Sequence, residues 1–388
     1  FRVVLSKLYK MVNNDRVSVC SFLLYTKSQK KKRGYKEKTM ANFMRQLKQI
    51  GRKIVESGSF ADELKKRAGE KQRTIVLCEG EDKRVVEAAQ RCVEEGVAKI
   101  VLLGKESEIK AANPEAVLDG IEIVDPATSP KLDEYAALLY ELRKAKGMTE
   151  EQAREQAKDA TFFGALMLKA GDADGLVSGA CHSTANTLRP GLQIIKTAPG
   201  VSAVSSFNVM IAPLGGNKYM DGDVLVFADC GLNPTYTAEG LADCALATAQ
   251  SAREIAGIEP KVAMLSFSTM GSARHDNVTL VQEATRIAKE KAPDLALDGE
   301  LQFDAALVPE VAAIKAPKSA VAGHANVFIF PDLQSGNIGY KIAERLGGFQ
   351  AVGPICQGFA KPLNDLSRGC KASDIVLAVA ITALQVKD

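Results

Sequence analysis

The sequence lacks the short motifs by which many enzymes bind nucleotides and metal ions. It contains no GxxxxGK(S/T) run and no GxGxxG run between a strand and a helix, so the common phosphate-binding loops of nucleotide enzymes are not expected. It also contains no HExxH motif, and its three histidines lie far apart along the chain, at His182, His275 and His324. We therefore predict no metal site and interpret each histidine as a structural or loop residue.

Long hydrophobic runs and a strong excess of one charge are missing as well. The longest apolar candidate, residues 17–25, is far shorter than the roughly 20 residues that cross a bilayer. The 50 Lys and Arg residues are nearly balanced by 47 Asp and Glu residues, which leaves a net charge of +3. A partner with a nucleic-acid backbone is therefore not expected, and neither is a membrane.

The eight cysteines follow no paired spacing. The chain has no CxxC pair and no set of cysteines spaced like zinc ligands. Scattered cysteines of this kind are typical of reduced thiols, so we expect a cytoplasmic protein.

The first 39 residues differ in composition from the rest of the chain. A basic run from Lys30 to Arg33 precedes Met40, where a mixed acidic and basic helical pattern begins. We interpret residues 1–39 as a poorly ordered leader upstream of the true start. The alternative is a basic targeting presequence, because Asp15 is the one acidic residue before Glu37.

From residue 41 onward, short apolar runs alternate with helical patterns, which is typical of an α/β fold with a largely parallel sheet. The expected strands lie at residues 73–78, 98–103, 121–124, near 177, and at 201–211, 224–227, 262–266 and 327–330. The longest expected helices lie at residues 130–146, 150–170, 238–256, 277–291 and 374–385. The 388 residues are enough for two α/β/α domains with a cleft between them.

Three arginines lie in loops rich in glycine and serine. They are Arg189 in SGACHSTANTLRP, Arg274 in STMGSAR and Arg368 in NDLSRGC. Because a guanidinium offers a planar set of donors that suits phosphate and carboxylate oxygens, a phosphorylated substrate is expected. Each arginine taken alone could equally be a surface or ion-paired residue.

Residues 361–374, KPLNDLSRGCKASD, bring a serine, an arginine and an aspartate to the start of the final helix. In structural terms, Ser373 or Asp374 is expected to cap that helix. In chemical terms, a helix N-terminus beside Arg368 would also stabilise a phosphate or a developing thiolate.

Several longer runs resemble the phosphate acetyltransferases of the phosphate acetyl/butyryltransferase family. The resemblance extends from about Phe43 to the C-terminus, and its main runs are DGLVSGACHST (174–184), STMGSA (268–273), DGELQFDAA (298–306), ANVFIFPDLQSGNIGYKIAERL (325–346) and GPICQGFAKPLNDLSRGC (353–370). One departure is Cys78, which replaces a proline that is usual in the family run near IVLCEGED. Lys371 and Ala372 also depart from the family pattern.

The resemblance implies a fold like that of isocitrate and isopropylmalate dehydrogenases, with the active site in the interdomain cleft. Residues 40–200 plus 358–388 would form the first domain. Residues 201–357 would form the second domain, through which a homodimer would assemble.

The resemblance also implies roles for individual residues. Asp374 would deprotonate the coenzyme A thiol, Ser367 would orient that thiol or stabilise the transition state, and Arg368 would hold the phosphoryl and carbonyl oxygens. The arginines expected to bind substrate are Arg143, Arg189 and, as a weaker match, Arg345.

The implied reaction is a reversible transfer of acetyl between acetyl phosphate and coenzyme A by direct thiolate attack. Coenzyme A would be a substrate, phosphate a product, and no cofactor would be needed. Two alternatives stay open: a phosphate butyryltransferase with a larger acyl pocket, and a noncatalytic domain that binds acetyl-CoA as a regulator. A metal-dependent dehydrogenase would share the fold, but its acidic metal cluster and cofactor loop are not evident in the sequence.

Overall fold

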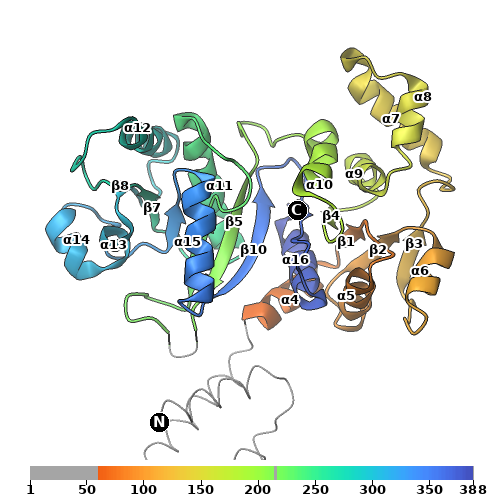
Figure 1. Cartoon of the computed structure of the whole chain (residues 1–388), viewed down its shortest axis with the longest axis horizontal. Helices are drawn as coiled ribbons and strands as arrows, with labels where there is room; N and C mark the ends of the chain where they lie inside the picture. The colour runs from red at the N-terminus through yellow and green to blue at the C-terminus, as the bar shows by residue number, and fades with distance from the viewer. Residues whose placement is uncertain (1–59, 214–215, 388) are drawn as a thin grey trace, which may run out of the picture. The chain divides into compact units, whose positions relative to one another are not determined.

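A computed structural model of the chain describes residues 60–213 and 216–387 (Figure 1). The leader predicted for residues 1–39 lies outside the described residues. The described residues from Ala61 onward belong to one unit that contains two β-sheets. Both sheets have helices packed on them, so the predicted α/β class is confirmed.

The first sheet has five parallel strands in the order β11-β4-β1-β2-β3. Successive residues of β1 point to opposite faces, and both faces are buried: Ile75 and Leu77 belong to one hydrophobic cluster, Val76 to another. Burial on both faces explains why β1 is continuously apolar after Thr74. The strands are β1 (Thr74–Leu77), β2 (Lys99–Leu103), β3 (Ile121–Val124), β4 (Gly175–Ser178) and β11 (Leu363–Asp365).

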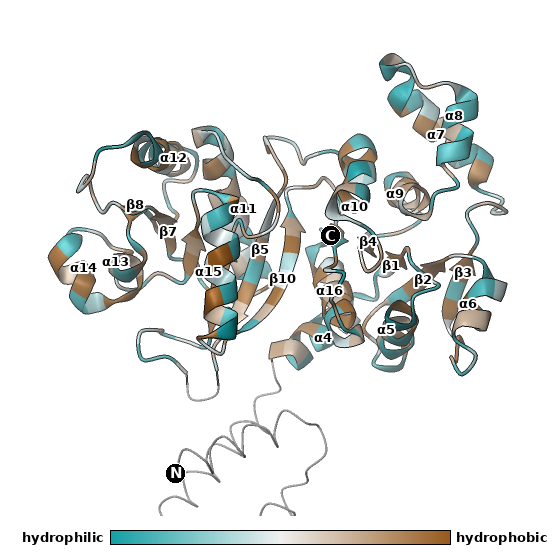
Figure 2. Ribbon diagram, in the orientation of Figure 1, coloured by the Kyte–Doolittle hydropathy of each residue, from teal (hydrophilic) through white to brown (hydrophobic). Residues whose placement is uncertain are grey.

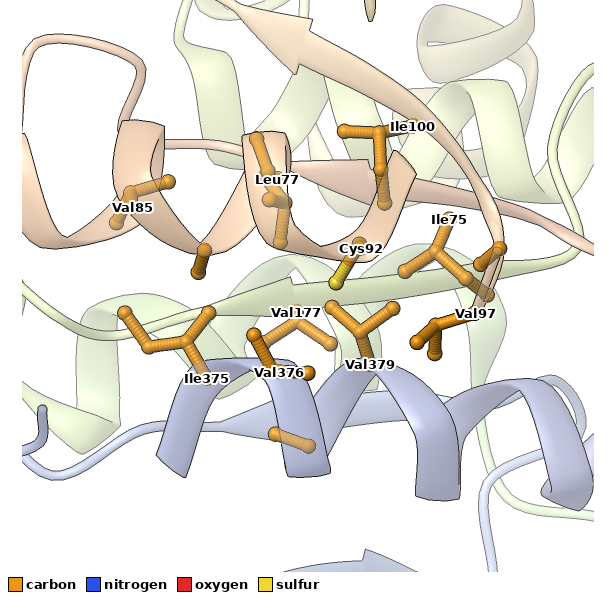
Figure 3. Packing of buried hydrophobic residues seen from close by; sticks show 14 of the residues in the cluster. Ile75, Leu77, Val85, Cys92, Val97, Ile100, Val177, Ile375, Val376 and Val379 are labelled. Atoms are coloured by element: carbon orange, nitrogen blue, oxygen red, sulfur yellow. The ribbon is translucent and has the colours of Figure 1, made fainter. Parts of the chain in front are cut away.

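Two helices from opposite ends of the described chain cover one face of this sheet. They are α5 (Lys83–Glu94) and α16 (Ala372–Gln385), whose apolar side chains meet those of β1 and β4 (Figure 3). On the other face, α7 (Leu132–Arg143) and α9 (Ala160–Ala170) pack, and Tyr135 and Phe163 meet edge to face at 4.9 Å.

The end of the chain returns to the first sheet through β11 and α16. Asn364 on β11 donates to Thr382 Oγ1 at 2.8 Å and to Gln385 Oε1 at 2.7 Å, both on α16. The hydrophobic run of α16 is visible as a mostly brown helix in Figure 2. This return places residues from about 363 onward beside strands that are formed some 200 residues earlier.

The second sheet has six strands in the order β10-β5-β6-β9-β7-β8. The pairs β10–β5 and β5–β6 are antiparallel, whereas β6, β9, β7 and β8 are parallel, so the prediction of a largely parallel sheet holds less well here. The strands are β5 (Ser205–Ile211), β6 (Val224–Ala228), β7 (Val262–Leu265), β8 (Leu297–Leu301), β9 (Val327–Ile329) and β10 (Gln350–Gln357).

One long helix expected at residues 150–170 is in fact two. Asp159 interrupts it, because its side chain accepts hydrogen bonds from the backbone of Thr161 and Phe162 and so begins a new helix. The remaining helices are α4 (Phe60–Lys71), α6 (Glu106–Ala112), η1 (Lys144–Lys146), α8 (Glu150–Gln156), α10 (Thr184–Pro190), η2 (Gly191–Ile195), α11 (Ala238–Glu254), α12 (Asp276–Lys291), α13 (Phe303–Leu307), α14 (Pro309–Lys315) and α15 (Leu333–Arg345).

Within the described ranges, the helices are all too short or too polar to span a bilayer. The seven cysteines in this part of the chain are free thiols, as expected for reduced cysteines, and six of them are buried.

Candidate active site

Three loops meet at the carboxyl edge of the first sheet. They follow β1 (residues 79–82), β4 (residues 179–183) and β11 (residues 366–371). Because β11, β4 and β1 are parallel neighbours, their carboxyl ends lie side by side. This edge is where parallel α/β sheets commonly bind their ligands.

The loop after β4 is organised by the buried carboxylate of Glu79, which is 1% exposed. Its oxygens accept hydrogen bonds from the backbone N–H groups of Gly179 at 3.1 Å, Ala180 at 2.9 Å and Cys181 at 2.9 Å. Such a set of amide donors satisfies an ionised carboxylate away from water. Gly179 adopts a φ of +111°, and a Cβ there would collide with Asp365 Oδ1. Glycine is therefore required at this turn.

Glu79 also holds a histidine. His182 Nδ1 lies 2.7 Å from Glu79 Oε1, and the His182 side chain is 36% exposed. The pair thus joins the first sheet to the surface of the loop after β4.

Arg84, on the first turn of α5, ties all three loops together. Its guanidinium donates to the carbonyl oxygens of Arg368 at 2.8 Å, Ala180 at 3.0 Å and Cys370 at 3.1 Å. The same guanidinium pairs with both oxygens of Asp82, at 3.0 and 2.8 Å. The planar arrangement of five N–H donors makes arginine suited to such a junction.

This network shifts the pKa values of Asp82 and Cys181 in opposite directions. The hydrogen bond from Arg84 lowers the pKa of Asp82 to about 2. The Cys181 thiol donates to Asp82 Oδ2 at 3.2 Å, and desolvation of its sulfur together with that bond raises its pKa to about 12. A thiol in this state is a poor nucleophile, because the thiolate is the reactive form.

The loop after β11 carries Ser367 and Arg368, and both residues are exposed. Ser367 Oγ accepts from the backbone of Gly369 at 3.3 Å, and the Ser367 carbonyl accepts from the Cys370 backbone at 2.9 Å. The loop is a tight turn, and its Arg368 and Cys370 carbonyls are held by Arg84. The backbone that carries the side chains of Ser367 and Arg368 is therefore anchored by Arg84.

Asp374 does not have the capping position that was predicted for it at the start of the final helix. Neither Ser373 nor Asp374 is the capping residue of α16, because the helix begins at Ala372 with Lys371 as its cap. Asp374 is in the first turn, where its exposed carboxylate accepts from the Lys371 backbone N–H at 2.9 Å. A carboxylate in the first turn of a helix is stabilised by the helix dipole.

Asp365 lies at the end of β11, two residues before Ser367, and is buried. Burial raises its pKa, and the hydroxyls of Thr184 and Thr187 oppose that effect. Two charged groups also act on it: Glu79 raises the pKa of Asp365, and Arg368 lowers it. A buried carboxyl thus lies at the base of the turn that carries Ser367 and Arg368.

The arginines predicted to bind substrate lie on three separate elements. Arg189 is on α10, which follows the loop after β4 directly, and its exposed side chain donates to Asn186 at 3.4 Å. Arg143 ends α7 and is half-buried. Arg345 ends α15; its side chain is 79% exposed and pairs with Glu344 at 3.3 Å. Arg189 is therefore next in sequence to a loop of the site, whereas Arg143 and Arg345 belong to helices elsewhere in the fold.

Four residues of this network were not predicted as site residues: Glu79, Asp82, Arg84 and His182. The first two belong to the run IVLCEGED, and His182 belongs to DGLVSGACHST, both of which carried the family resemblance. The runs were a usable signal, but only the fold shows which of their side chains contact one another.

Across residues 60–213 and 216–387, no three side chains of His, Cys, Asp or Glu gather as a metal-binding group.

The site lies within a region that matches a known family. Residues 59–383 match the model of the phosphate acetyl/butaryl transferase family. The chain is 55% identical to a phosphate acetyltransferase of Clostridium acetobutylicum over 322 residues, which cover 82% of this chain and 96% of that protein. It is 53% identical to a phosphate acetyltransferase of Acetivibrio thermocellus over 329 residues, which cover 85% of this chain and 98% of that protein.

A solved structure shows the same similarity in three dimensions. A phosphotransacetylase from Streptococcus pyogenes superimposes with a TM-score of 0.79 at 49% identity. The match covers 84% of this chain and 98% of that structure. Sequence and fold therefore agree on the same relatives.

Proposed function

The chain belongs to the phosphate acetyl/butaryl transferase family, and we propose that it transfers an acetyl group reversibly between acetyl phosphate and coenzyme A. One observation of the structure supports this function most directly. The guanidinium of Arg84 anchors the turn that displays Ser367 and Arg368, at the sheet edge where α/β folds bind ligands. Phosphate, acetyl phosphate and coenzyme A are the proposed ligands, and no cofactor is required.

In the proposed mechanism the coenzyme A thiolate attacks the acetyl carbonyl directly. Asp374 takes the thiol proton, Ser367 orients the sulfur, and Arg368 stabilises the charge on the carbonyl and phosphoryl oxygens. A thiol has an ordinary pKa of about 8.5 and a carboxylate one of about 4, so the thiolate needs help from nearby positive charge. Arg368 and the N-terminus of α16 supply that charge, and each well-placed donor contributes a few kcal/mol to the transition state.

Arg143, Arg189 and Arg345 are proposed to bind the phosphates of the substrates. Arg189 has the strongest support, because α10 begins two residues after His182.

The proposed assembly is a homodimer joined through the second sheet and its helices. The helix α15 and its C-terminal cap residue carry a stripe of exposed apolar side chains at Ile338, Ile342 and Leu346, which are 57%, 54% and 85% exposed. Figure 2 shows this helix with hydrophobic and hydrophilic bands. Spacing of four residues puts the three side chains on one face, and a second copy of the chain would cover it.

We also propose the division into a first domain of residues 40–200 plus 358–388 and a second domain of residues 201–357. The return of β11 and α16 to the first sheet supports this division. The free cysteines of the described residues are compatible with the proposed cytoplasmic location.

The experiment that tests the function is formation of acetyl-CoA from acetyl phosphate and coenzyme A, with EDTA present and butyryl phosphate as a competing substrate. Acetyl transfer that survives the chelator is the expected result. A preference for butyryl phosphate would instead assign the chain to the butyryl branch of the family. Tight acetyl-CoA binding without turnover would favour a regulatory module and refute the proposed catalysis.

A further inference from the structure

The pair of Glu79 and His182 has no role in the reaction as proposed above. Glu79 is buried, while the His182 ring reaches the surface of the loop after β4. Three backbone N–H groups already donate to Glu79, so its oxygens act as acceptors. His182 Nδ1, 2.7 Å away, must therefore be the donor.

This contact fixes the orientation of the imidazole. With the proton on Nδ1, the lone pair of the neutral ring is on Nε2. Nδ1 faces a carboxylate that is 1% exposed, whereas the His182 side chain as a whole is 36% exposed, so we infer that the exposed part of the ring is the edge that bears Nε2. A buried carboxylate that holds an imidazole in this way is the arrangement by which acyl-transfer enzymes orient a general base and stabilise the imidazolium that it forms.

His182 is also close to the proposed catalytic turn. The carbonyl of Ala180, two residues before it, shares the Arg84 guanidinium with the carbonyl of Arg368. The backbone N–H of Leu366 donates to the carbonyl of Ser178 at 2.7 Å, which joins the two loops at their bases. The loops after β4 and β11 are thus held together at two points.

The proposed reaction needs a proton on the oxygen of the departing phosphate. When the bond between the acetyl carbon and the phosphate oxygen breaks, the dianionic phosphoryl group would leave as a strongly basic trianion. A general acid that protonates the leaving oxygen removes this barrier, and such proton transfers contribute about 100- to 10,000-fold in rate.

We propose that His182, oriented by Glu79, gives this proton to the departing phosphate oxygen and takes it back in the reverse reaction. The inference rests on the proposed function and deepens it. His182 is then a catalytic residue, and Glu79 is a positioning residue that acts through it.

The atoms and charges balance in both directions. In the forward direction His182 starts as the imidazolium, with a proton on each ring nitrogen. The sulfur forms a bond to the acetyl carbon, the carbon–oxygen bond to phosphate breaks, and the Nε2 proton goes to the leaving oxygen to give monohydrogen phosphate and the neutral imidazole. The thiol proton passes to Asp374 and then to solvent, and the imidazole recovers a proton from solvent. In reverse, neutral Nε2 takes the proton of monohydrogen phosphate as its oxygen attacks the thioester.

The test uses His182→Asn and His182→Ala in the full chain. The asparagine amide can keep the hydrogen bond to Glu79 but has no Nε2, so the loop stays anchored while the acid is lost. We expect kcat for acetyl-CoA formation to fall by about 100-fold or more, with little change in KM for coenzyme A. Added imidazole should restore turnover to His182→Ala in a concentration-dependent way.

The matched control is His324→Asn. His324 Nδ1 lies 3.6 Å from a carboxylate oxygen of Asp221, outside the site. This variant should keep wild-type turnover.

The outcomes separate the inference from the proposed function. Wild-type turnover in a folded His182→Asn variant would overturn the role of His182 but leave acetyl transfer intact. Loss of activity in both variants without rescue by imidazole would show a structural role and also overturn it. If the wild-type protein itself transfers no acetyl group, the proposed function fails first.

Discussion

Replacement of Arg84 by methionine should loosen all three loops of the candidate site at once. The guanidinium donates to the carbonyls of Ala180, Arg368 and Cys370 and pairs with Asp82. Methionine retains most of the aliphatic stem, so any change in stability or turnover reports the removal of the guanidinium alone.

The expected decrease in the free energy of unfolding of Arg84→Met follows from these contacts. A hydrogen bond to a charged group contributes about 1.5–3 kcal/mol, but the Arg84 side chain is 32% exposed, so water replaces part of each contact. We take about 1 kcal/mol for each carbonyl. The shift of the Asp82 pKa from 3.8 to about 2 sets an upper bound of about 2.5 kcal/mol for that pair. The three carbonyl contacts together with at most this amount should lower the free energy of unfolding by about 3 to 5.5 kcal/mol.

The assay is urea unfolding followed by circular dichroism, together with steady-state kinetics. Arg84→Met, Asp82→Asn and the double variant form a double-mutant cycle, in which we expect a coupling energy of about 1–2 kcal/mol between the two side chains. Turnover of Arg84→Met should also fall by about tenfold or more, because the Arg368 backbone loses its anchor.

The matched control is Arg91→Met, on the same helix. Arg91 pairs with Glu95 at 3.3 Å on the surface, where both side chains are about one-third exposed, so its loss should cost less than about 0.5 kcal/mol. The reasoning would be refuted if Arg84→Met matched this control in stability and retained wild-type turnover.

Three further predictions concern the same loops. Arg368→Ala should lose most of its turnover with an unchanged unfolding midpoint; near-normal activity in the folded variant would contradict the assignment. Gly179→Ala should lose about 3 kcal/mol in urea unfolding, because its φ is +111° and the new Cβ would lie 2.7 Å from the Leu366 nitrogen. The pKa of Asp82 is depressed to about 2, so the stability that its ionised form contributes is present above about pH 4 and lost as the pH falls towards 2. Asp82→Asn should flatten that part of the stability curve; an unchanged curve would count against the pairing.

Much of the fold could be predicted because the spacing of apolar residues along the chain reflects which faces of each strand and helix are buried. Strand β3 has the predicted bounds, and β1, β2, β6, β7 and β9 agree within one residue at each end. Apart from β3, whose Glu122 is exposed, these strands are buried on both faces over most of their length, so their signal is strong. The α/β class was correct because the alternation of apolar runs with helical patterns can be read along the chain. The family was correct because the order of its motifs can be read in the same way.

Other elements could not be predicted from local pattern. Strand β11 has three residues, two of them polar, and it exists because Asn364 finds its partners on α16 and on β10. Polar strand residues are stable in a buried position only where the fold supplies hydrogen bonds. Likewise, the break before α9 depends on a single capping side chain, Asp159.

The sequence by itself determined the α/β class, the family and the run that carries Ser367, Arg368 and Asp374. Each of these depends on residues close together in the chain or on the order of motifs. Only the tertiary structure decided that Glu79 holds His182 and that Arg84 joins three loops. Those contacts span 103 residues in the first case and 286 in the longest of the second. They arise because parallel strands distant in sequence end at the same edge of one sheet.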